Sequence, residues 1–135
     1  MTGAALTPEQ QEQVVALAMD LAREGRTAEL VDFVEHGLPV DVTDREGNTL
    51  LMLAAYRGRA ETAQALIARG ADVDLRNDRD QSPVAGAIFK GEDDIVRALV
   101  AAGADLDAGT PTGRAAAVLF GREHLLEARE GQAGG

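Results

Sequence analysis

The sequence predicts an all-α solenoid of about four stacked helix–turn–helix units, with the terminal units acting as caps. Composition is the first observation behind this prediction. Hydrophobic residues make up 45% of the 135 residues, but aromatic residues make up only 3%. The apolar residues are therefore mostly Ala, Leu and Val, which suit closely packed short helices better than a β-sandwich.

A repeat of constant length is the second observation. Glycines and aspartates recur every 33 residues in three separate series. The text around them also agrees, since "IARGADVDL" (67–75) matches "VAAGADLDA" (100–108). The three series are Gly25, Gly58 and Gly91; Gly37, Gly70 and Gly103; and Asp41, Asp74 and Asp107.

The segment "DREGNTLLMLAAYRGRAETAQALIARGADVDLRN" (44–77) resembles the ankyrin repeat, and the resemblance extends over roughly residues 11 to 130. It implies an ankyrin-repeat solenoid. The family's T-P-L-H tetrapeptide reads TLLM at 49–52 and SPVA at 82–85, without the histidine. In the family this turn joins neighbouring repeats by hydrogen bonds, so the departure affects those bonds rather than the fold.

The middle unit shows the expected helix pair. Apolar periodicity predicts helices over 50–57 and 60–69, with Gly58 in the turn between them and Gly70 at the C′ position of the second. Thr49 and Ser82 are expected to cap the helices that follow them, and Pro83 suits a first helical position.

The first and last units are expected to differ from the middle ones. In the first, a capping box at Thr7 and Gln10 predicts a helix over 8–23, followed by a second helix over 27–35. Leu30, Phe33 and Val34 should face inward, as should the residues 33 and 66 positions further on. In the last, a helix should begin at about Arg114. His124 stands where the inter-helix glycine would recur, so that helix is expected to continue to about Arg129.

The whole chain (1–135) is predicted to be one domain. Its units should span about 8–42, 43–75, 76–108 and 109–130, with a frayed tail over 131–135. A short array with an incomplete last unit is expected to be a monomer or a weak homodimer.

Charge and cysteine content exclude several classes of protein. The net charge of −10, from 23 acids and 13 bases, argues against binding nucleic acid or an anionic membrane. The absence of cysteine excludes disulfides and thiolate metal sites. No apolar stretch is long enough to span a bilayer and no secretory signal is visible, so the cytoplasm is the expected location.

The ankyrin resemblance implies a binding surface on the concave groove, formed by the turn tips and the inner surface of the first helix of each pair. Carried over position by position, it falls on Arg23 in the first unit, Arg45, Glu46, Asn48, Tyr56 and Arg57 in the second, Asp78, Arg79, Gln81, Phe89 and Lys90 in the third, and Arg114 and Arg122 in the fourth. Glu24, Thr112 and Glu123 lie beside them.

Tyr56 and Phe89 are notable because they are 33 residues apart and each is followed by a base. Aromatic residues beside cations are enriched at binding hot spots. The alternative is that both rings only cover neighbouring side chains. Seven of the 13 bases fall on the groove positions, so that face is expected to be neutral or basic although the molecule is acidic. The alternative is that these bases are ordinary solvated surface residues with no binding role.

No constellation of residues suggests catalysis, a cofactor or a metal. His36 and His124 lack a partner at zinc-binding spacing. Asp72 and Asp74, like Asp105 and Asp107, recur with the repeat and are expected to belong to the turns. The acids at 92–94 fit the first turn of a helix.

The expected function is a non-catalytic adaptor or regulator that binds a partner protein on the groove. An alternative is a small acidic inhibitor of the immunity or antitoxin type, which would block a basic enzyme through the convex face or the helix ends. Charge reversal at Glu29, Asp32 and Glu35 would test it. An enzyme or small-ligand binder is the least favoured reading.

Overall fold

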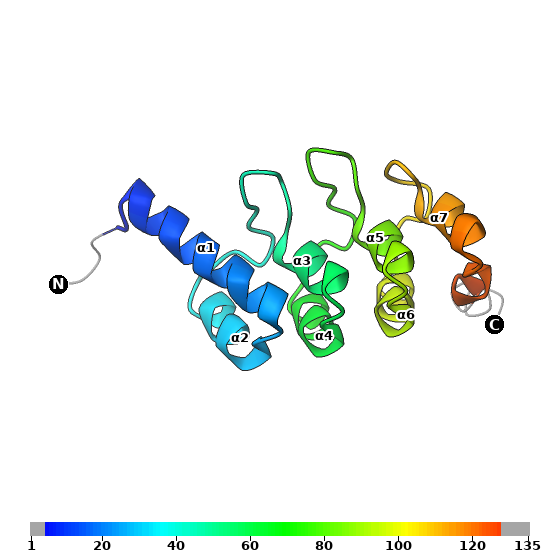
Figure 1. Cartoon of the computed structure of the whole chain (residues 1–135). Coiled ribbons are helices and arrows are strands. Elements are labelled where there is room, and N and C mark those ends of the chain that lie inside the picture. The colour runs from blue at the N-terminus through cyan, green and yellow to red at the C-terminus, as the bar shows by residue number, and fades with distance from the viewer. Residues whose placement is uncertain (1–4, 128–135) are drawn as a thin grey trace.

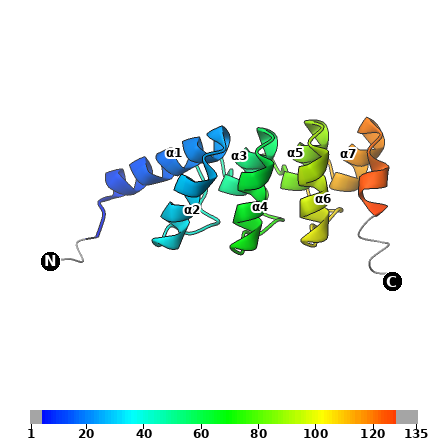
Figure 2. The ribbon, with the colours of Figure 1, turned by 90° about the horizontal axis from the view of Figure 1, so that it is seen from below.

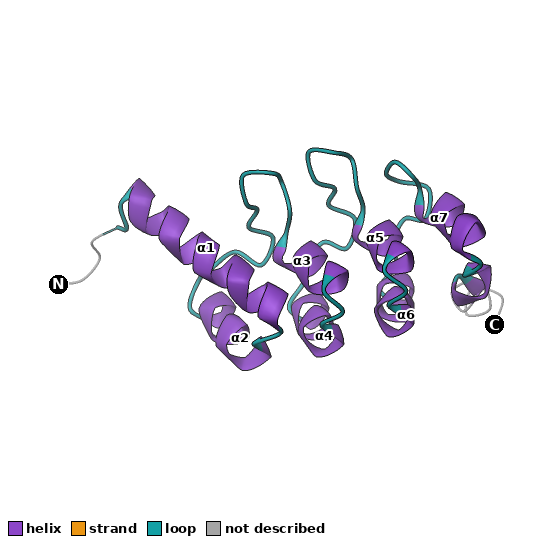
Figure 3. Cartoon of the chain, in the orientation of Figure 1, coloured by secondary structure: helices purple, strands orange, loops and turns teal. Residues whose placement is uncertain are grey.

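The computed structural model describes residues 5–127, and Figure 1 shows them as a row of helix pairs. Over these residues the structure has α-helices and loops but no strand (Figure 3), apart from an isolated bridge between Thr43 and Thr49. The helices are α1 (Pro8–Glu24), α2 (Thr27–Glu35), α3 (Leu50–Tyr56), α4 (Ala60–Ala68), α5 (Pro83–Phe89), α6 (Asp93–Ala101) and α7 (Gly113–Phe120), followed by the 3₁₀ helix η1 (Glu123–Leu125).

The helices form two layers. One layer holds α1, α3, α5 and α7, each packed on the next, and the other holds α2, α4 and α6 (Figures 1 and 2). The loops before α3, α5 and α7 project to the side away from the second layer. This arrangement confirms the predicted solenoid of stacked helix pairs.

Each of the four first-layer helices begins after a residue whose side chain caps it. These helices begin at or next to the residue that the sequence predicts. Thr49 Oγ1 accepts a hydrogen bond from Met52 N at 3.0 Å, and Ser82 Oγ accepts one from Ala85 N at 3.2 Å. Thr7 forms the predicted capping box with Gln10. Thr112 caps α7 in the same way, so this helix begins at Gly113. Each cap satisfies one amide that the first helical turn leaves without a partner.

The last unit corrects the sequence interpretation. Its helix ends at Phe120, because Gly121 adopts a left-handed conformation with φ of 68°. Gly58 and Gly91 adopt the same conformation, with φ of 71° and 73°. Gly121, and not His124, is therefore the inter-helix glycine of the last unit.

The loop before α7 explains the error. The caps Thr49 and Ser82 are 33 residues apart, whereas Ser82 and Thr112 are 30 apart, so this loop is three residues shorter than the preceding one. The predicted continuation of one helix towards Arg129 is wrong from Gly121 to Leu126. Arg129 itself and the predicted tail lie outside the described residues.

The core runs continuously through the stack. Leu30, Leu66 and Leu99, one member of each predicted inward face, are completely buried. Phe33 and Ile67 pack against the same core but keep part of their surface exposed. No helix pair has enough buried surface to be stable alone, so stacking supplies the stability.

Carboxylates join neighbouring units through a recurring bond, which we call the aspartate ladder. Asp41 Oδ1 accepts from Asp72 N at 2.9 Å, and Asp74 Oδ1 accepts from Asp105 N at 2.7 Å. The next carboxylate in the series, Asp107, accepts from Arg114 Nε at 3.1 Å. The aspartate pairs therefore belong to the turn scaffold, as the sequence predicts.

A second connection links the projecting loops. Asn77 Nδ2 donates to Asn48 Oδ1 at 2.9 Å, and Asp78 N donates to Glu46 O at 2.9 Å. Together with the aspartate ladder, these bonds join the units without the histidine of the T-P-L-H turn.

Candidate functional site

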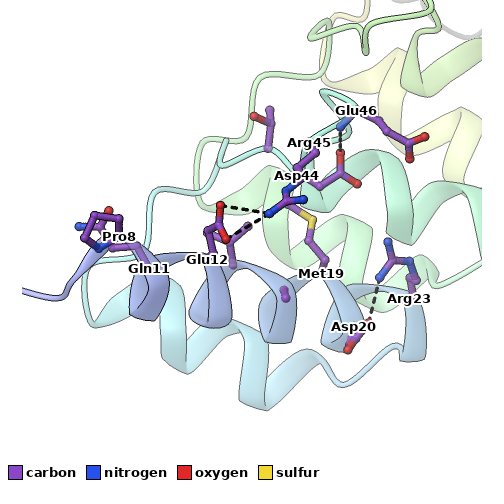
Figure 4. Close-up of a pocket in the computed structure, with 12 residues that line it drawn as sticks. Pro8, Gln11, Glu12, Met19, Asp20, Arg23, Asp44, Arg45 and Glu46 are labelled. Atoms are coloured by element: carbon purple, nitrogen blue, oxygen red, sulfur yellow. Dashed lines mark hydrogen bonds and ion pairs between the residues drawn. The ribbon is translucent and has the colours of Figure 1, made fainter.

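A pocket of about 810 Å³ lies between α1 and the first projecting loop (Figure 4). Arg45 at the loop tip reaches across to Glu12, with its Nη2 3.2 Å from Oε1, and Arg23 pairs with Asp20 at 2.9 Å. The lining of the pocket combines acidic and basic side chains with apolar ones. The lining residues are Pro8, Gln11, Glu12, Val15, Ala16, Met19, Asp20, Arg23, Thr43, Asp44, Arg45 and Glu46.

One position near the end of each first-layer helix forms a row along the molecule. With the shorter last loop taken into account, the row consists of Arg23, Tyr56, Phe89 and Leu119. Arg23 lines the pocket opposite the first loop, and Arg79 of the second loop is close enough to Tyr56 to influence its pKa. The row therefore faces the projecting loops. We define the inner face as the surface made by three parts: this row, the residue that follows each member of the row, and the loops at 43–49 and 76–82.

Tyr56 is partly buried, because its ring occupies space that a glycine leaves open. A Cβ atom at Gly86 would lie only 1.7 Å from Tyr56 Cε1. Burial raises the pKa of the Tyr56 phenol above 10.0, and the Arg79 cation acts in the opposite direction. Tyr56 thus packs between α3 and α5, which agrees with the structural alternative for this ring.

Phe89 differs from Tyr56 although the two occupy equivalent positions. The residue equivalent to Gly86 in the last unit is Ala116, whose methyl group is buried. A ring cannot lie in the space that this methyl fills, so Phe89 remains 65% exposed. Its ring meets that of Phe120 edge to face, with centroids 5.3 Å apart and planes at 82°.

The basic side chains fall into two groups. Most described arginines form ion pairs: Arg23, Arg26, Arg45, Arg69, Arg76, Arg97, Arg114 and Arg122. Arg59 instead donates to the backbone carbonyl of Arg23 at 2.8 Å. Among the described residues, Arg57, Arg79 and Lys90 form no ion pair, and all three lie on the inner face. The positive charge available on this surface is concentrated beside Tyr56 and Phe89.

Two predicted binding residues serve the loops themselves. Asn48 is buried, accepts from Asn77 and donates to Asp44 Oδ2 at 3.2 Å. Gln81 accepts from Asn77 Nδ2 at 2.7 Å. Their neighbours Glu46 and Asp78 are exposed at the loop tips. The structure thus leaves the tips, rather than the loop bases, available for contact.

The structure does not place the predicted binding residues of the last unit, Arg114 and Arg122, in the row that contains Tyr56 and Phe89. Arg114 pairs with Asp107. The residues that hold the equivalent position in α3 and α5 are buried. Arg122 Nε lies 3.1 Å from Asp93 Oδ1 and links the chain after α7 to α6. The inner-face positions of this unit are instead held by Leu119, 73% exposed, and Phe120. The glycine at 121 is the sequence signal that would have identified them.

The described part of the chain does not bring metal-ligating side chains together. No cluster of three or more His, Asp or Glu side chains is arranged to hold a metal ion there. The pocket beside α1 is lined by neither histidine and by none of the aspartates in the ladder. None of the helices between residues 5 and 127 has the length and apolar content to cross a membrane.

The fold and the surface define a helical-repeat protein that presents one continuous face made from successive units. Residues 18–110 match the family described as ankyrin repeats, in three copies. The chain belongs to this family, whose repeats are generally protein–protein interaction modules.

A relative in Pseudomonas aeruginosa, named as an ankyrin repeat protein, is 44% identical over 57 residues. The match covers 42% of this chain and 33% of the relative. The chain thus spans about a third of the length of the curated relative it matches.

Proposed function

We propose that the protein is a non-catalytic adaptor or regulator that binds a partner protein on the groove formed by its inner face. Such a partner would be bound in the cytoplasm, the location expected in the sequence analysis. The family supports the general role, and the inner face supplies the specific surface.

One observation carries the proposal. Arg57, Arg79 and Lys90 form no ion pair among the described residues, although the chain holds 23 acids and most of its arginines are paired. Lys90 follows Phe89, a large ring that is 65% exposed, while Arg57 and Arg79 lie beside Tyr56 in the preceding unit. Exposed aromatic rings next to arginine are typical of residues that dominate binding energy.

The alternative of an acidic inhibitor gains no comparable support. Its proposed contact residues on α2 are each engaged: Glu29 with Arg26, Asp32 with His36, and Glu35 with Arg69. These exposed pairs contribute little to stability, but they reduce the free negative charge that would attract a basic enzyme.

The proposal can be tested by capturing partners from extracts of the source cell with the full-length chain. In the test variant, Arg57, Arg79, Phe89 and Lys90 are replaced together by Ser. All four side chains are exposed, so the variant should keep the helical circular dichroism and unfolding midpoint of the wild type. Loss of the captured partner with the fold intact is the expected result.

A matched control changes Arg69 and Arg97 to Ser. These exposed bases lie on or just after α4 and α6, away from the inner face. The control should capture the same partner as the wild type. An inner-face variant that also retains the partner would contradict the proposal.

A further inference from the structure

The inner face ends in an apolar surface that the fixed 33-residue alignment conceals. It consists of Phe89, Leu119 and Phe120, and we call it the apolar end of the inner face. Phe89 is 65% exposed, Leu119 73% and Phe120 39%, and the two phenylalanine rings are in contact. Large apolar side chains grouped in this way mark a binding surface more often than isolated ones do.

Positive charge lies immediately beside this apolar end. Lys90 follows Phe89 in the chain, Arg57 holds the equivalent place in the preceding unit, and Arg79 faces Tyr56 from the second loop. None of the three has an ion-pair partner among the described residues. Along the helices of the stack, the inner face therefore changes from free cations at the ends of α3 and α5 to apolar side chains at α7, while the exposed carboxylates of Glu46 and Asp78 lie at the loop tips.

We propose that the inner face binds a segment of a partner protein in which acidic residues precede or follow a large apolar side chain. The carboxylates would contact Arg57, Arg79 and Lys90, and the apolar side chain would contact Phe89, Leu119 and Phe120. This inference rests on the proposed function and adds the chemistry of the partner to it. Complementary charge fixes orientation and favours encounter, while burial of the apolar anchor supplies affinity.

Two other occupants of the apolar end fit less well. A second copy of this chain would bring a molecule of net charge −10 against another of the same charge. Residues 128–135, AREGQAGG, include no large apolar side chain that could bury the rings. Charge complementarity therefore favours a separate acidic and apolar segment.

The probe for the test is a display library of short random peptides, selected on the full-length chain. Three variants are then compared with the wild type: Leu119→Ser with Phe120→Ser; Arg57→Glu with Arg79→Glu and Lys90→Glu; and the control Arg69→Ser with Arg97→Ser. Selected peptides should be enriched in Asp or Glu together with a Leu, Ile, Met or aromatic residue. Affinity should fall about tenfold or more in each of the first two variants and stay unchanged in the control.

The outcomes separate this inference from the proposed function. Peptides that need Arg57, Arg79 and Lys90 but bind equally well without Leu119 and Phe120 would overturn the apolar anchor while leaving an inner-face binder. Peptides that are indifferent to both sets of substitutions would count against the proposed function as well. A wild-type dimer that becomes a monomer on Leu119→Ser with Phe120→Ser, measured by light scattering, would show that a second copy is the occupant and overturn the inference.

Discussion

Gly86 is the residue that decides how Tyr56 is placed. Replacing it with Ala would put a methyl group 1.7 Å from a ring carbon of Tyr56, so the ring must leave its site between α3 and α5. Overpacking of this kind costs about 1–3 kcal/mol. We expect Gly86→Ala to lower the free energy of unfolding in urea by an amount in that range.

A double variant shows whether the ring causes this loss. If Tyr56 is the obstacle, Gly86→Ala should cost much less in a Tyr56→Ala background, because the two residues are in contact and their effects are not additive. Equal costs in the two backgrounds would mean that the loss arises from the backbone of α5 instead.

Tyr56 also offers a pH-dependent observable. Burial raises its pKa above 10.0, and as the single tyrosine of a chain without tryptophan it alone produces the ultraviolet change on ionisation. The folded protein should therefore titrate above the midpoint found in denaturant. Because the folded-state pKa is the higher one, this contribution to stability is complete below pH 10 and is lost as pH rises through the folded pKa.

Arg79 provides a control for that titration. Its cation favours the phenolate and so lowers the pKa of Tyr56. Arg79→Ala should move the tyrosine midpoint further upward. An unchanged midpoint would place Arg79 away from the ring and weaken its assignment to the inner face.

At the level of single residues, the sequence could show that Tyr56 and Phe89 are equivalent but not that they differ. The difference depends on whether Gly86 or Ala116 lies in the following helix, a contact across units that no local pattern reports. The pairing state of each arginine is similarly invisible, because Arg45 finds Glu12 at a distance of 33 residues in the chain.

The end of α7 is the element on which the register of the last unit depends. Gly121 has φ of 68°, a conformation that costs a residue with a side chain about 1–2 kcal/mol. Gly121→Ala should therefore lower stability by roughly that amount, measured by urea unfolding. A constant 33-residue repeat would instead give the structural role to position 124.

His124→Gly distinguishes the two registers. Since His124 lies within η1, a glycine there should be neutral or mildly destabilising. A stabilising effect of His124→Gly, together with a neutral Gly121→Ala, would restore the constant repeat and contradict the helix end at Phe120.

Element boundaries in the first three units could be predicted closely, because caps, glycines and apolar periodicity agree there. The predicted helix over 27–35 coincides with α2, and the predicted 50–57 differs from α3 by one residue. The last unit could not be placed by counting, since three residues are missing from its loop. The same shift misplaced the inner-face residues, assigning Arg122 where Leu119 stands.

At the scale of the whole molecule, stability should depend on where the stack is weakened. Leu66 of α4 is completely buried, and α4 packs on α2, α3 and α6. Leu66→Ala should cost about 2–5 kcal/mol and shift the unfolding of the entire array.

The terminal position Leu125 serves as the comparison. It is buried in η1, which packs on α6 and α7. Leu125→Ala should accelerate amide hydrogen exchange chiefly in α6, α7 and η1 and leave α1 to α4 protected. Uniform acceleration in every helix would indicate that the array has no separable end.

The aspartate ladder has a consequence for how such a chain can change in length. Each bond runs from a carboxylate of one unit to an amide of the next, with the same spacing of 31 residues at Asp41–Asp72 and at Asp74–Asp105. A tandem duplication of one whole unit would therefore give every new carboxylate a new amide and leave no bond unmatched. Asp107 accepts from the side chain of Arg114, so it is the carboxylate of the series that a duplicated unit would provide with a backbone amide.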